Sequence, residues 1–199
     1  MTGNITDENI ALLEEKISQA EAILVGAGVG LSTAAGFTYS GKRFHQWFFD
    51  FEQAYGIRDM YSGGFYPFPS REIYWAWWSR QIYLNRYVDA PLPVYPQLLD
   101  LVHGKEYFVL TTNVDHQFQR AGFDKKRLFY TQGDYGLFQK ERPGRKKETW
   151  DNEEMVYRML EAQGFVKDRD CRYQVPADGH IRKAIPASLV PKAPDDGSP

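Results

Sequence analysis

The sequence predicts an α/β fold with a partial parallel sheet, a helical aromatic-rich insertion over residues 39–89 and a reduced module over 141–199. Short apolar segments at 22–26 and 106–112 each run into glycine or polar residues, as parallel strands do where they approach a ligand crevice. A change in composition separates the two segments, because aromatic residues crowd the stretch between them. We therefore expect residues 1–199 to form a single domain with one helical insertion.

The other elements follow from hydrophobic spacing and capping residues. Thr6 begins a helix in which apolar residues recur every three or four positions. A helix from Ser70 carries tryptophans around most of its circumference, which is typical of a buried helix. Residues 140–148 are expected to form an exposed basic loop, and the chain beyond Gly164 to be poorly structured. We also expect helices at 94–102, 117–122 and 152–163, a strand at 127–131 and a candidate fourth strand at 137–139.

The composition restricts the class of protein. With 199 residues, 43% of them hydrophobic and 16% aromatic, the chain can bury a packed core in one domain. A net charge of −2 provides no electrostatic argument for binding nucleic acid or an anionic membrane. Charged residues near the N-terminus, and no apolar run close to the roughly 20 residues of a membrane span, predict a cytosolic protein. Cys171 is the only cysteine, which excludes an internal disulfide and any site that needs two thiolates.

A glycine-rich turn follows the first predicted strand. Gly26, Ala27 and Gly28 precede Ser32 in a segment that then becomes helical. Glycines there let backbone N–H groups approach a phosphate, and the start of the helix adds a favourable dipole. The spacing departs from the G-x-G-x-x-G fingerprint, since Leu31 stands where the third glycine belongs. A dinucleotide-dependent dehydrogenase is therefore disfavoured, and an ordinary tight turn remains an alternative.

Polar residues also follow the second and third predicted strands. Asn113 and Asp115 point the same way if the strand continues, so one site could receive both side chains. Capping of a turn by these two residues is the alternative. Gln132 supplies a further polar side chain after the third strand. His116 would face the opposite side from Asp115, and His103 is expected to satisfy carbonyl groups at the end of a helix.

Taken in order, these segments resemble the sirtuin family over about residues 8–165. The macrodomain-linked microbial sirtuins are the most similar in detail. The segment from Thr111 to Asp115 resembles the family's T-Q-N-I-D signature, with Thr112 in place of glutamine. Gln132 and Gly133 fall where a sirtuin has its catalytic His-Gly pair. The first nucleotide-binding signature is matched by Gly26, Ala27, Gly28, Ser32 and Gly36.

The resemblance implies that NAD binds to the first half of a Rossmann-like domain. In that family nicotinamide leaves the ribose C1′ atom and an acceptor attacks there. By position, Asp115 would hold the nicotinamide carboxamide, Asn113 would orient the ribose or the attacking group, and Gln132 would complete the catalytic set. The implied contacts with the cofactor come from Gly26, Ala27, Gly28, Ser32, Gly36, Thr112, Asn113 and Asp115.

Gln132 changes the chemistry that the resemblance implies. Sirtuin deacetylation needs a base near neutrality, which imidazole provides and a carboxamide does not. The prediction is therefore NAD-dependent protein ADP-ribosyltransfer, with a macrodomain protein as a partner and a lipoyl-carrier protein as the acceptor, both implied by the resemblance alone. An inactive, truncated sirtuin homologue that only binds a nucleotide or a partner is one alternative. A residual deacylase is another.

Two features depart from the family pattern. Sirtuins usually hold a zinc ion with four cysteines, whereas this chain has Cys171 alone, so no metal site is expected. Residues 191–197 resemble the family's C-P-x-C-G segment with both thiols replaced. The family also places the strands for the adenosine half of NAD after the zinc module. The sheet of this chain is therefore expected to be partial.

Overall fold

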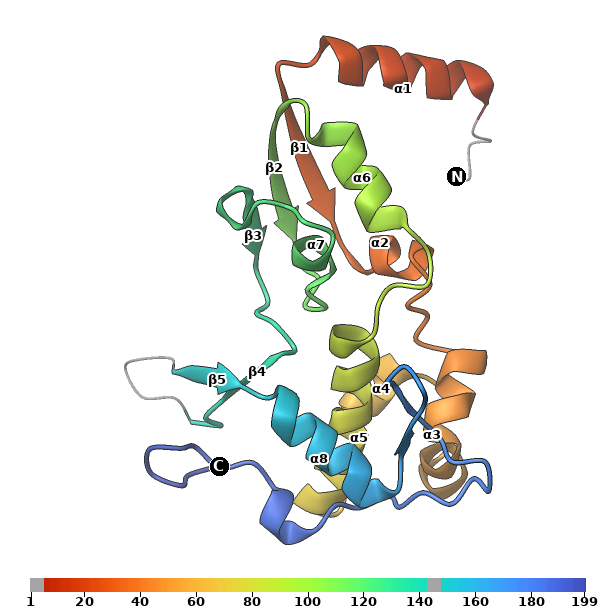
Figure 1. The fold of residues 1–199 in the computed structure, drawn as a ribbon, viewed down its shortest axis with the longest axis vertical. Coiled ribbons are helices and arrows are strands. Elements are labelled where there is room, and N and C mark those ends of the chain that lie inside the picture. Colours follow the sequence, from red (N-terminus) through yellow and green to blue (C-terminus); the bar gives the residue numbers. More distant parts are fainter. Residues whose placement is uncertain (1–5, 143–147) are drawn as a thin grey trace.

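The computed structural model describes residues 6–142 and 148–199, which form a sheet lobe and an aromatic helical lobe (Figure 1). The sheet lobe contains β1 (Ala22–Ala27), α2 (Val29–Ala34), α6 (Val94–Val102), β2 (Glu106–Thr111), α7 (Gln117–Arg120), η2 (Lys125–Arg127) and β3 (Leu128–Tyr130). The helical lobe contains α3 (Lys42–Tyr55), α4 (Met60–Gly64), α5 (Arg71–Ile82), the π-helical turn η1 (Tyr83–Tyr87) and α8 (Glu153–Gln163). The predicted α/β class and the helical insertion are confirmed.

The three strands of the sheet lobe run parallel in the order β1-β2-β3. Val25 pairs with Val109, which in turn pairs with Leu128, and this row packs into the core with α6. The opposite face of the sheet carries large apolar side chains that remain exposed, among them Leu24 at 70% and Phe129 at 56%. The sheet is therefore covered on one face only.

The first helix, α1 (Asp7–Gln19), begins as predicted. The Thr6 hydroxyl accepts a hydrogen bond from the N–H of Asn9 at 3.3 Å. At the other end, the Lys105 ammonium donates to the carbonyl oxygens of Ser18 and Ala20 at 2.7 and 3.0 Å. A cation at that position satisfies carbonyls that the helix leaves unpaired.

The predicted fourth strand at 137–139 does not belong to the parallel sheet. It forms β4 (Leu137–Gln139), which pairs antiparallel with β5 (Thr149–Asp151) in a separate ribbon. Phe138 is buried in this ribbon against the aromatic core, with its ring 5.0 Å from that of Trp75. Packing against the helical lobe therefore outweighs continuation of the sheet. Residues 143–147 of the predicted basic loop lie outside the described residues.

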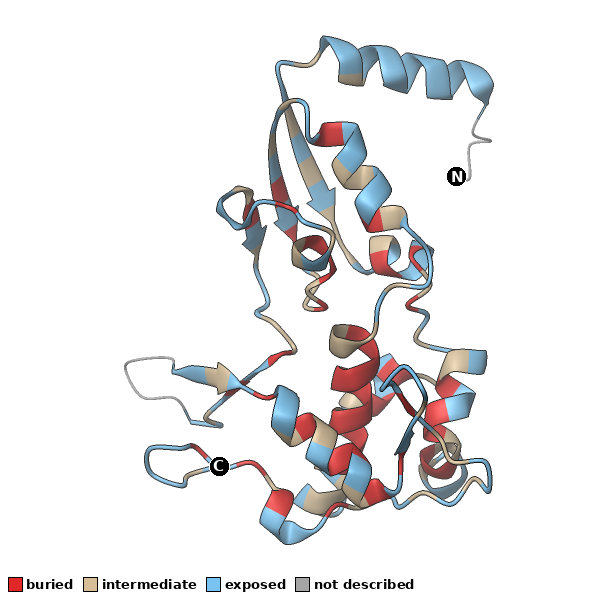
Figure 2. Cartoon of the chain, in the orientation of Figure 1, coloured by how far each residue is buried: buried red, intermediate tan, exposed pale blue. Residues whose placement is uncertain are grey.

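Aromatic side chains fill the interior of the helical lobe, and α5 is the most buried of its α-helices (Figure 2). Trp77 is fully buried, and its ring lies 4.3 Å from that of Phe48 and 5.2 Å from that of Phe51. Gly63 allows α4 to lie directly on this indole, because a Cβ atom at Gly63 would fall 2.0 Å from the Trp77 ring. Gly63 thus sets the distance between α4 and α5.

A fully buried cation, Arg80, lies at the centre of this lobe. Its guanidinium binds both carboxylate oxygens of Asp50, at 2.6 and 2.9 Å. It also donates to the Gln163 side chain and to the carbonyls of Trp47 and Arg182, at 2.8, 2.8 and 3.0 Å. These five hydrogen bonds satisfy all five N–H donors of the guanidinium. Desolvation lowers the pKa of Arg80, and the carboxylate of Asp50 opposes that shift.

The segment beyond Gly164 is better ordered than the sequence predicts. It forms β6 (Val166–Lys167), which pairs with β7 (Tyr173–Gln174), and the short η3 (Ala187–Leu189). Ile185 and Leu189 are buried in the aromatic cluster, and the Tyr173 N–H donates to the Tyr83 hydroxyl at 2.7 Å. The expectation of a poorly structured C-terminal segment is therefore wrong. The stabilising contacts are long-range, so no local periodicity reveals them.

Replacement of Asp50 tests the buried ion pair. Asp50→Ala should reduce the free energy of unfolding by about 3 to 5 kcal/mol, because it leaves the Arg80 charge buried without its counter-ion. Glu141→Ala is the matched control, since it removes the carboxylate from an exposed pair with Arg71 and should cost about 1 kcal/mol or less. Urea unfolding measures both. Equal losses in the two variants would contradict the prediction.

Candidate functional site

A cleft of about 520 Å³ lies where the carboxyl ends of β1 and β2 meet the helical lobe. This is the edge of an open α/β sheet at which ligands are generally bound. One wall comes from the sheet lobe and is mostly polar, while the other comes from the helical lobe and is mostly aromatic. The lining residues are Val29, Ser32, Tyr39, Tyr61, Gly64, Phe65, Trp78, Gln81, Thr112, Asn113, Val114, Asp115, Gln132 and Tyr135.

Four polar side chains form a connected network on the sheet side of the cleft. The Ser32 hydroxyl donates to the Asp115 carboxylate at 2.5 Å and lies 2.8 Å from the Tyr95 hydroxyl. The Tyr95 hydroxyl is 3.4 Å from the same carboxylate oxygen and accepts from the Asn113 amide at 3.2 Å. Residues far apart in the sequence are thereby held together. The predicted residues Ser32, Asn113 and Asp115 do share one site.

Burial alters the acid–base properties of this network. Desolvation raises the pKa of Asp115, although hydrogen bonds from Ser32, the Gln117 N–H and Tyr95 oppose the shift. Desolvation and the nearby Asp115 carboxylate raise the pKa of Tyr95 well above its ordinary value. Burial likewise raises the pKa of Tyr39 to about 12. Both tyrosines therefore stay protonated near neutral pH and present O–H groups.

The strand β2 ends at Thr111, so strand alternation is not what brings Asn113 and Asp115 together. A turn follows instead, in which the Asn113 N–H donates to the Thr111 hydroxyl at 3.0 Å. One oxygen of Asp115 also accepts from the Gln117 N–H at 3.2 Å at the start of α7. Asp115 therefore both caps the turn and takes part in the shared site. One carboxylate oxygen caps the turn while the other joins the cleft network.

None of the predicted glycine-turn residues Gly26, Ala27 and Gly28 is among the residues that line the cleft, although Gly28 lies next to Thr112, which is. Gly28 is the N-cap residue of α2, and a Cβ atom there would lie 3.4 Å from the Thr112 hydroxyl. Gly26 and Ala27 are the last residues of β1. Gly36 lies away from the cleft with a φ of 100°, and a Cβ atom on it would fall 2.8 Å from Pro91. Glycine is therefore required at position 36 by the positive φ and by the close packing against Pro91, and not by a contact in the cleft.

Gln132 and Thr112 both line the cleft. Across residues 6–142 and 148–199, neither side chain has a hydrogen-bond partner within the protein. Gln132 lies in the loop after β3, which continues to Tyr135 on the aromatic side of the cleft. Both side chains can therefore bind a ligand without breaking an internal contact.

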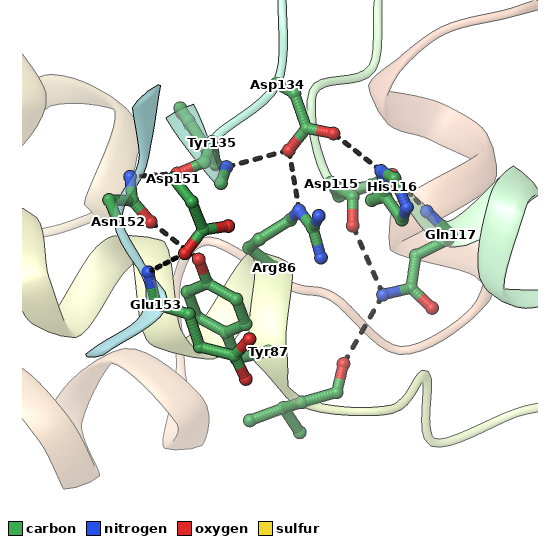
Figure 3. A network of polar contacts seen from close by, with 12 residues as sticks. Arg86, Tyr87, Asp115, His116, Gln117, Asp134, Tyr135, Asp151, Asn152 and Glu153 are labelled. Atoms are coloured by element: carbon green, nitrogen blue, oxygen red, sulfur yellow. Dashed lines mark hydrogen bonds and ion pairs between the residues drawn. The ribbon is translucent and has the colours of Figure 1, made fainter. Parts of the chain in front are cut away.

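His116 belongs to a neighbouring ion-pair network rather than to the cleft lining (Figure 3). Its Nδ1 atom is 2.5 Å from Asp134, whose other carboxylate oxygen accepts from the Arg86 Nε–H at 2.6 Å. The backbone of His116 is left-handed, with a φ of 63°. This network joins the turn after β2 to η1. His103 ends α6, where its Nδ1 atom is 2.9 Å from the Asp100 carbonyl, as predicted.

Several residues of the site were missed by the sequence prediction. Tyr95 lies on α6, in a pattern that indicates an ordinary core helix, and it meets Ser32 across 63 positions of sequence. Trp78 and Tyr135 line the aromatic wall. A high local density of aromatic residues indicates a hydrophobic core. The sequence does not distinguish the few aromatic residues that line the cleft from those buried in the core.

Metal-binding groups are not gathered at this site. Among the residues that the structure describes, no three histidine, cysteine or acidic side chains are close enough to hold a metal ion. Cys171 is exposed and lies between β6 and β7. Within the described part of the chain, no helix has the length and apolarity needed to cross a bilayer.

Solved structures with this arrangement of elements are Sir2 proteins. A Sir2 homologue in complex with NAD matches with a TM-score of 0.53 and 18% identity, over 87% of this chain and 61% of that one. A second Sir2 enzyme structure matches with a TM-score of 0.51 and 16% identity, over 92% and 69% of the two chains. The fold is therefore that of the Sir2 proteins, or sirtuins.

Sequence comparison leads to a narrower group of relatives. A protein ADP-ribosyltransferase of Staphylococcus aureus is 39% identical over 153 residues, which are 76% of this chain and 48% of the relative. A probable bifunctional ADP-ribose hydrolase/ADP-ribosyltransferase of Fusarium oxysporum is 33% identical over 68% of this chain and 23% of its own length. The chain thus spans about half or less of these curated relatives. No protein-family model matches it. The chain is a sirtuin relative, similar to protein ADP-ribosyltransferases.

Replacement of Asp115 tests the electrostatics of the cleft. A raised pKa means that the protonated carboxyl stabilises the fold, and that this contribution is lost as the pH rises through the folded-state pKa. Asp115→Asn should therefore gain stability relative to the unmodified chain as the pH rises above about 4, the ordinary pKa of an aspartate. Urea unfolding across this range measures the difference, with the exposed Asp170→Asn as control. A difference independent of pH would contradict the raised pKa.

Proposed function

We propose that this chain binds NAD in the cleft and transfers ADP-ribose to a protein acceptor with release of nicotinamide. The observation that carries the proposal is the convergence of Ser32, Asn113, Asp115 and Gln132 on one cleft at the carboxyl edge of a Sir2-type sheet. The same residues occupy the positions of the sirtuin signatures. The relative from Staphylococcus aureus is itself a protein ADP-ribosyltransferase.

The residues present fit NAD. The cleft volume of about 520 Å³ is in the range of small-molecule sites, which is about 300 to 1,000 Å³. Gly28 begins α2 without a side-chain cap, and the first backbone bond of this turn is the one from the Leu31 N–H to the Gly28 carbonyl, so the N–H groups before Leu31 are left for a ligand. Gly26 and Ala27 complete the backbone of this turn, which is the proposed phosphate contact.

Each polar side chain then has a separate proposed role. Bound NAD supplies a glycosidic bond at the ribose C1′ atom, whose cleavage releases neutral nicotinamide. Asp115 accepts from the nicotinamide carboxamide, and Ser32 and Tyr95 keep that carboxylate in place. Asn113 is held through its Nδ2 group by Tyr95, which leaves its carbonyl oxygen to orient a ribose hydroxyl. Thr112 adds a hydroxyl next to Gly28, and Gly36 supports the turn from outside the cleft.

Gln132 favours transfer over deacylation. Its carboxamide can donate to and accept from hydroxyl groups, but it does not take a proton near neutral pH. Deacylation of the sirtuin kind requires that proton transfer, whereas an acceptor with its own nucleophile needs only to be positioned. Gln132 is therefore proposed to orient the acceptor or the ribose.

The partners follow from the relatives and from the family resemblance. A protein acceptor is proposed from the Staphylococcus aureus relative. The Fusarium relative combines an ADP-ribose hydrolase with a transferase in one chain, which supports a macrodomain protein as a functional partner. A lipoyl-carrier protein as the acceptor rests on the family resemblance.

Calorimetric titration with NAD, followed by measurement of nicotinamide release, tests this proposal. The unmodified chain should bind NAD and release nicotinamide. Asn113→Ala should lower the rate of release by about 100-fold, because the ribose loses a positioning group at the reacting centre. Asn9→Ala, on the exposed face of α1, is the control and should have no effect. No NAD binding by the folded chain, or unchanged release in Asn113→Ala, would overturn the assignment.

Gln132→His tests the role of the carboxamide. If the chain fails to deacylate only because residue 132 cannot accept a proton, Gln132→His should gain NAD-dependent deacylation of an acyl-lysine peptide. The unmodified chain should show none. Mass spectrometry of the peptide measures the product, and NAD titration checks that the variant still binds. Absence of deacylation in a Gln132→His variant that still binds NAD, or deacylation by the unmodified chain at the rate of the variant, would contradict the role given to Gln132.

A further inference from the structure

A lysine at the end of β4 binds two carboxylates near the C-terminus, where the chain runs beside the β4–β5 ribbon (Figure 1). The Nζ atom of Lys140 is 2.7 Å from Asp195 and 2.8 Å from Asp196. The Lys140 side chain is 18% exposed, compared with 47% for Lys167 in its pair with Glu161. Hydrogen bonds with the two carboxylates raise the pKa of Lys140 to about 12, and the ammonium lowers the pKa of Asp196. These three residues, Lys140, Asp195 and Asp196, form a charge clamp.

The two aspartates lie in a closed backbone turn over residues 193–198. The Gly197 N–H donates to the Ala193 carbonyl at 2.9 Å, and the Ala193 N–H donates to the Ser198 carbonyl at 2.7 Å. Gly197 has a φ of 70°, a conformation that glycine adopts without strain. The Ser198 N–H also donates to the Asp196 carboxylate at 2.9 Å. Local hydrogen bonds therefore shape the turn, and the charge clamp attaches it to a segment 55 positions earlier in the chain.

Two uncharged contacts accompany the charge clamp. The Glu141 N–H donates to the Pro199 carbonyl at 3.0 Å, and Ala193 is buried. The residues between Ala193 and Ser198 are exposed. Burial of apolar surface therefore contributes little to holding this turn against the ribbon, and the ionic contacts of Lys140 carry a larger share than usual.

The turn contains the segment that resembles the C-P-x-C-G signature of the sirtuin zinc module. Pro194 and Gly197 match the proline and the glycine of that signature, which places Ala193 and Asp196 at its two cysteines. The methyl group of Ala193 cannot bind a metal, and the Asp196 carboxylate already binds the Lys140 ammonium. Structural zinc takes four ligands, usually cysteine or histidine. The residues present therefore do not fit a zinc ion.

The position of Lys140 also opposes binding of another cation. A metal ion between Asp195 and Asp196 would lie next to the ammonium or would have to displace it. Cys171 lies between β6 and β7, on a different ribbon from the charge clamp. The zinc that the family resemblance implies for this module thus has neither its ligands nor an uncharged space here.

We propose that the charge clamp replaces zinc as the cross-link of this module. A structural metal holds two segments together by taking ligands from both. Lys140 achieves the same with a cation that belongs to one segment and binds two carboxylates of the other. The module then folds without metal and weakens with salt, because ion pairs open to solvent are screened. None of the three residues lines the cleft, so this role of Lys140 is independent of the proposed function.

Protection of the Glu141 amide from hydrogen exchange measures the attachment, because its N–H is bonded to Pro199 only while the turn lies on the ribbon. Lys140→Met removes the charge and keeps the aliphatic stem, so it should lower the protection at least about fivefold. Lys140→Arg keeps a cation and should stay within about twofold of the unmodified chain. Lys167→Met removes a lysine from an exposed pair and is the matched control, with no change expected at Glu141.

A double-mutant cycle identifies the partner of the lysine. Asp196→Asn should lower the protection of Glu141 in the unmodified chain and have a smaller effect when Lys140→Met is already present. Equal effects in the two backgrounds would show that the two residues do not act together, and would overturn the proposal.

Metal analysis tests the other half of the proposal. The chain purified with zinc present should hold less than about 0.1 zinc per molecule, and EDTA should leave Glu141 protection unchanged. Raising NaCl to about 1 M, where charges are screened beyond about 3 Å, should lower that protection in the unmodified chain even if Lys140→Met does not fold. One zinc per chain whose removal lowers the protection, or a folded Lys140→Met with full protection, would overturn the proposal. Should Lys140→Met not fold, protection that is insensitive to salt would do so.

Discussion

The buried Arg80 guanidinium is the interaction on which the helical lobe depends. A cation removed from water is tolerated only when its donors are satisfied and a counter-ion is present. Arg80 obtains these from α3 and α8 and from the C-terminal segment at Arg182. Aromatic faces complete its surroundings, with Phe51 and Phe165 about 5 Å from the guanidinium carbon. One side chain thus fixes the relative positions of segments that are distant in sequence.

The cleft is a consequence of how the two lobes meet. The sheet lobe contributes turns at the ends of β1 and β2, and the helical lobe contributes α4 and α5. Gly63 lets α4 lie directly on the Trp77 ring of α5, and α4 and α5 both contribute aromatic residues to the cleft lining. A polar wall and an aromatic wall facing each other suit two reactants of different character. That division of the cleft underlies the proposed transfer reaction.

Much of the fold could be predicted from local patterns. The strands at β1, β2 and β3, the Thr6 cap and the start of α5 at Ser70 all depend on residues within a few positions of each other. The polar residues Asn113 and Asp115 were recognised by their place after a strand, although a turn rather than strand alternation brings them together. The ribbon of β4 and β5 and the packing of the C-terminal segment were not predictable in this way.

The sequence by itself determined the α/β class, the resemblance to sirtuins and the polar residues of the candidate site, because short-range spacing and signature order carry that information. The tertiary structure alone decided that Tyr95 joins Ser32 and Asp115, that Lys140 binds Asp195 and Asp196, and that Gly36 serves packing rather than lining the cleft. The physical reason is that burial and hydrogen-bond partners arise from contacts across many tens of residues. Neither periodicity nor propensity encodes those contacts.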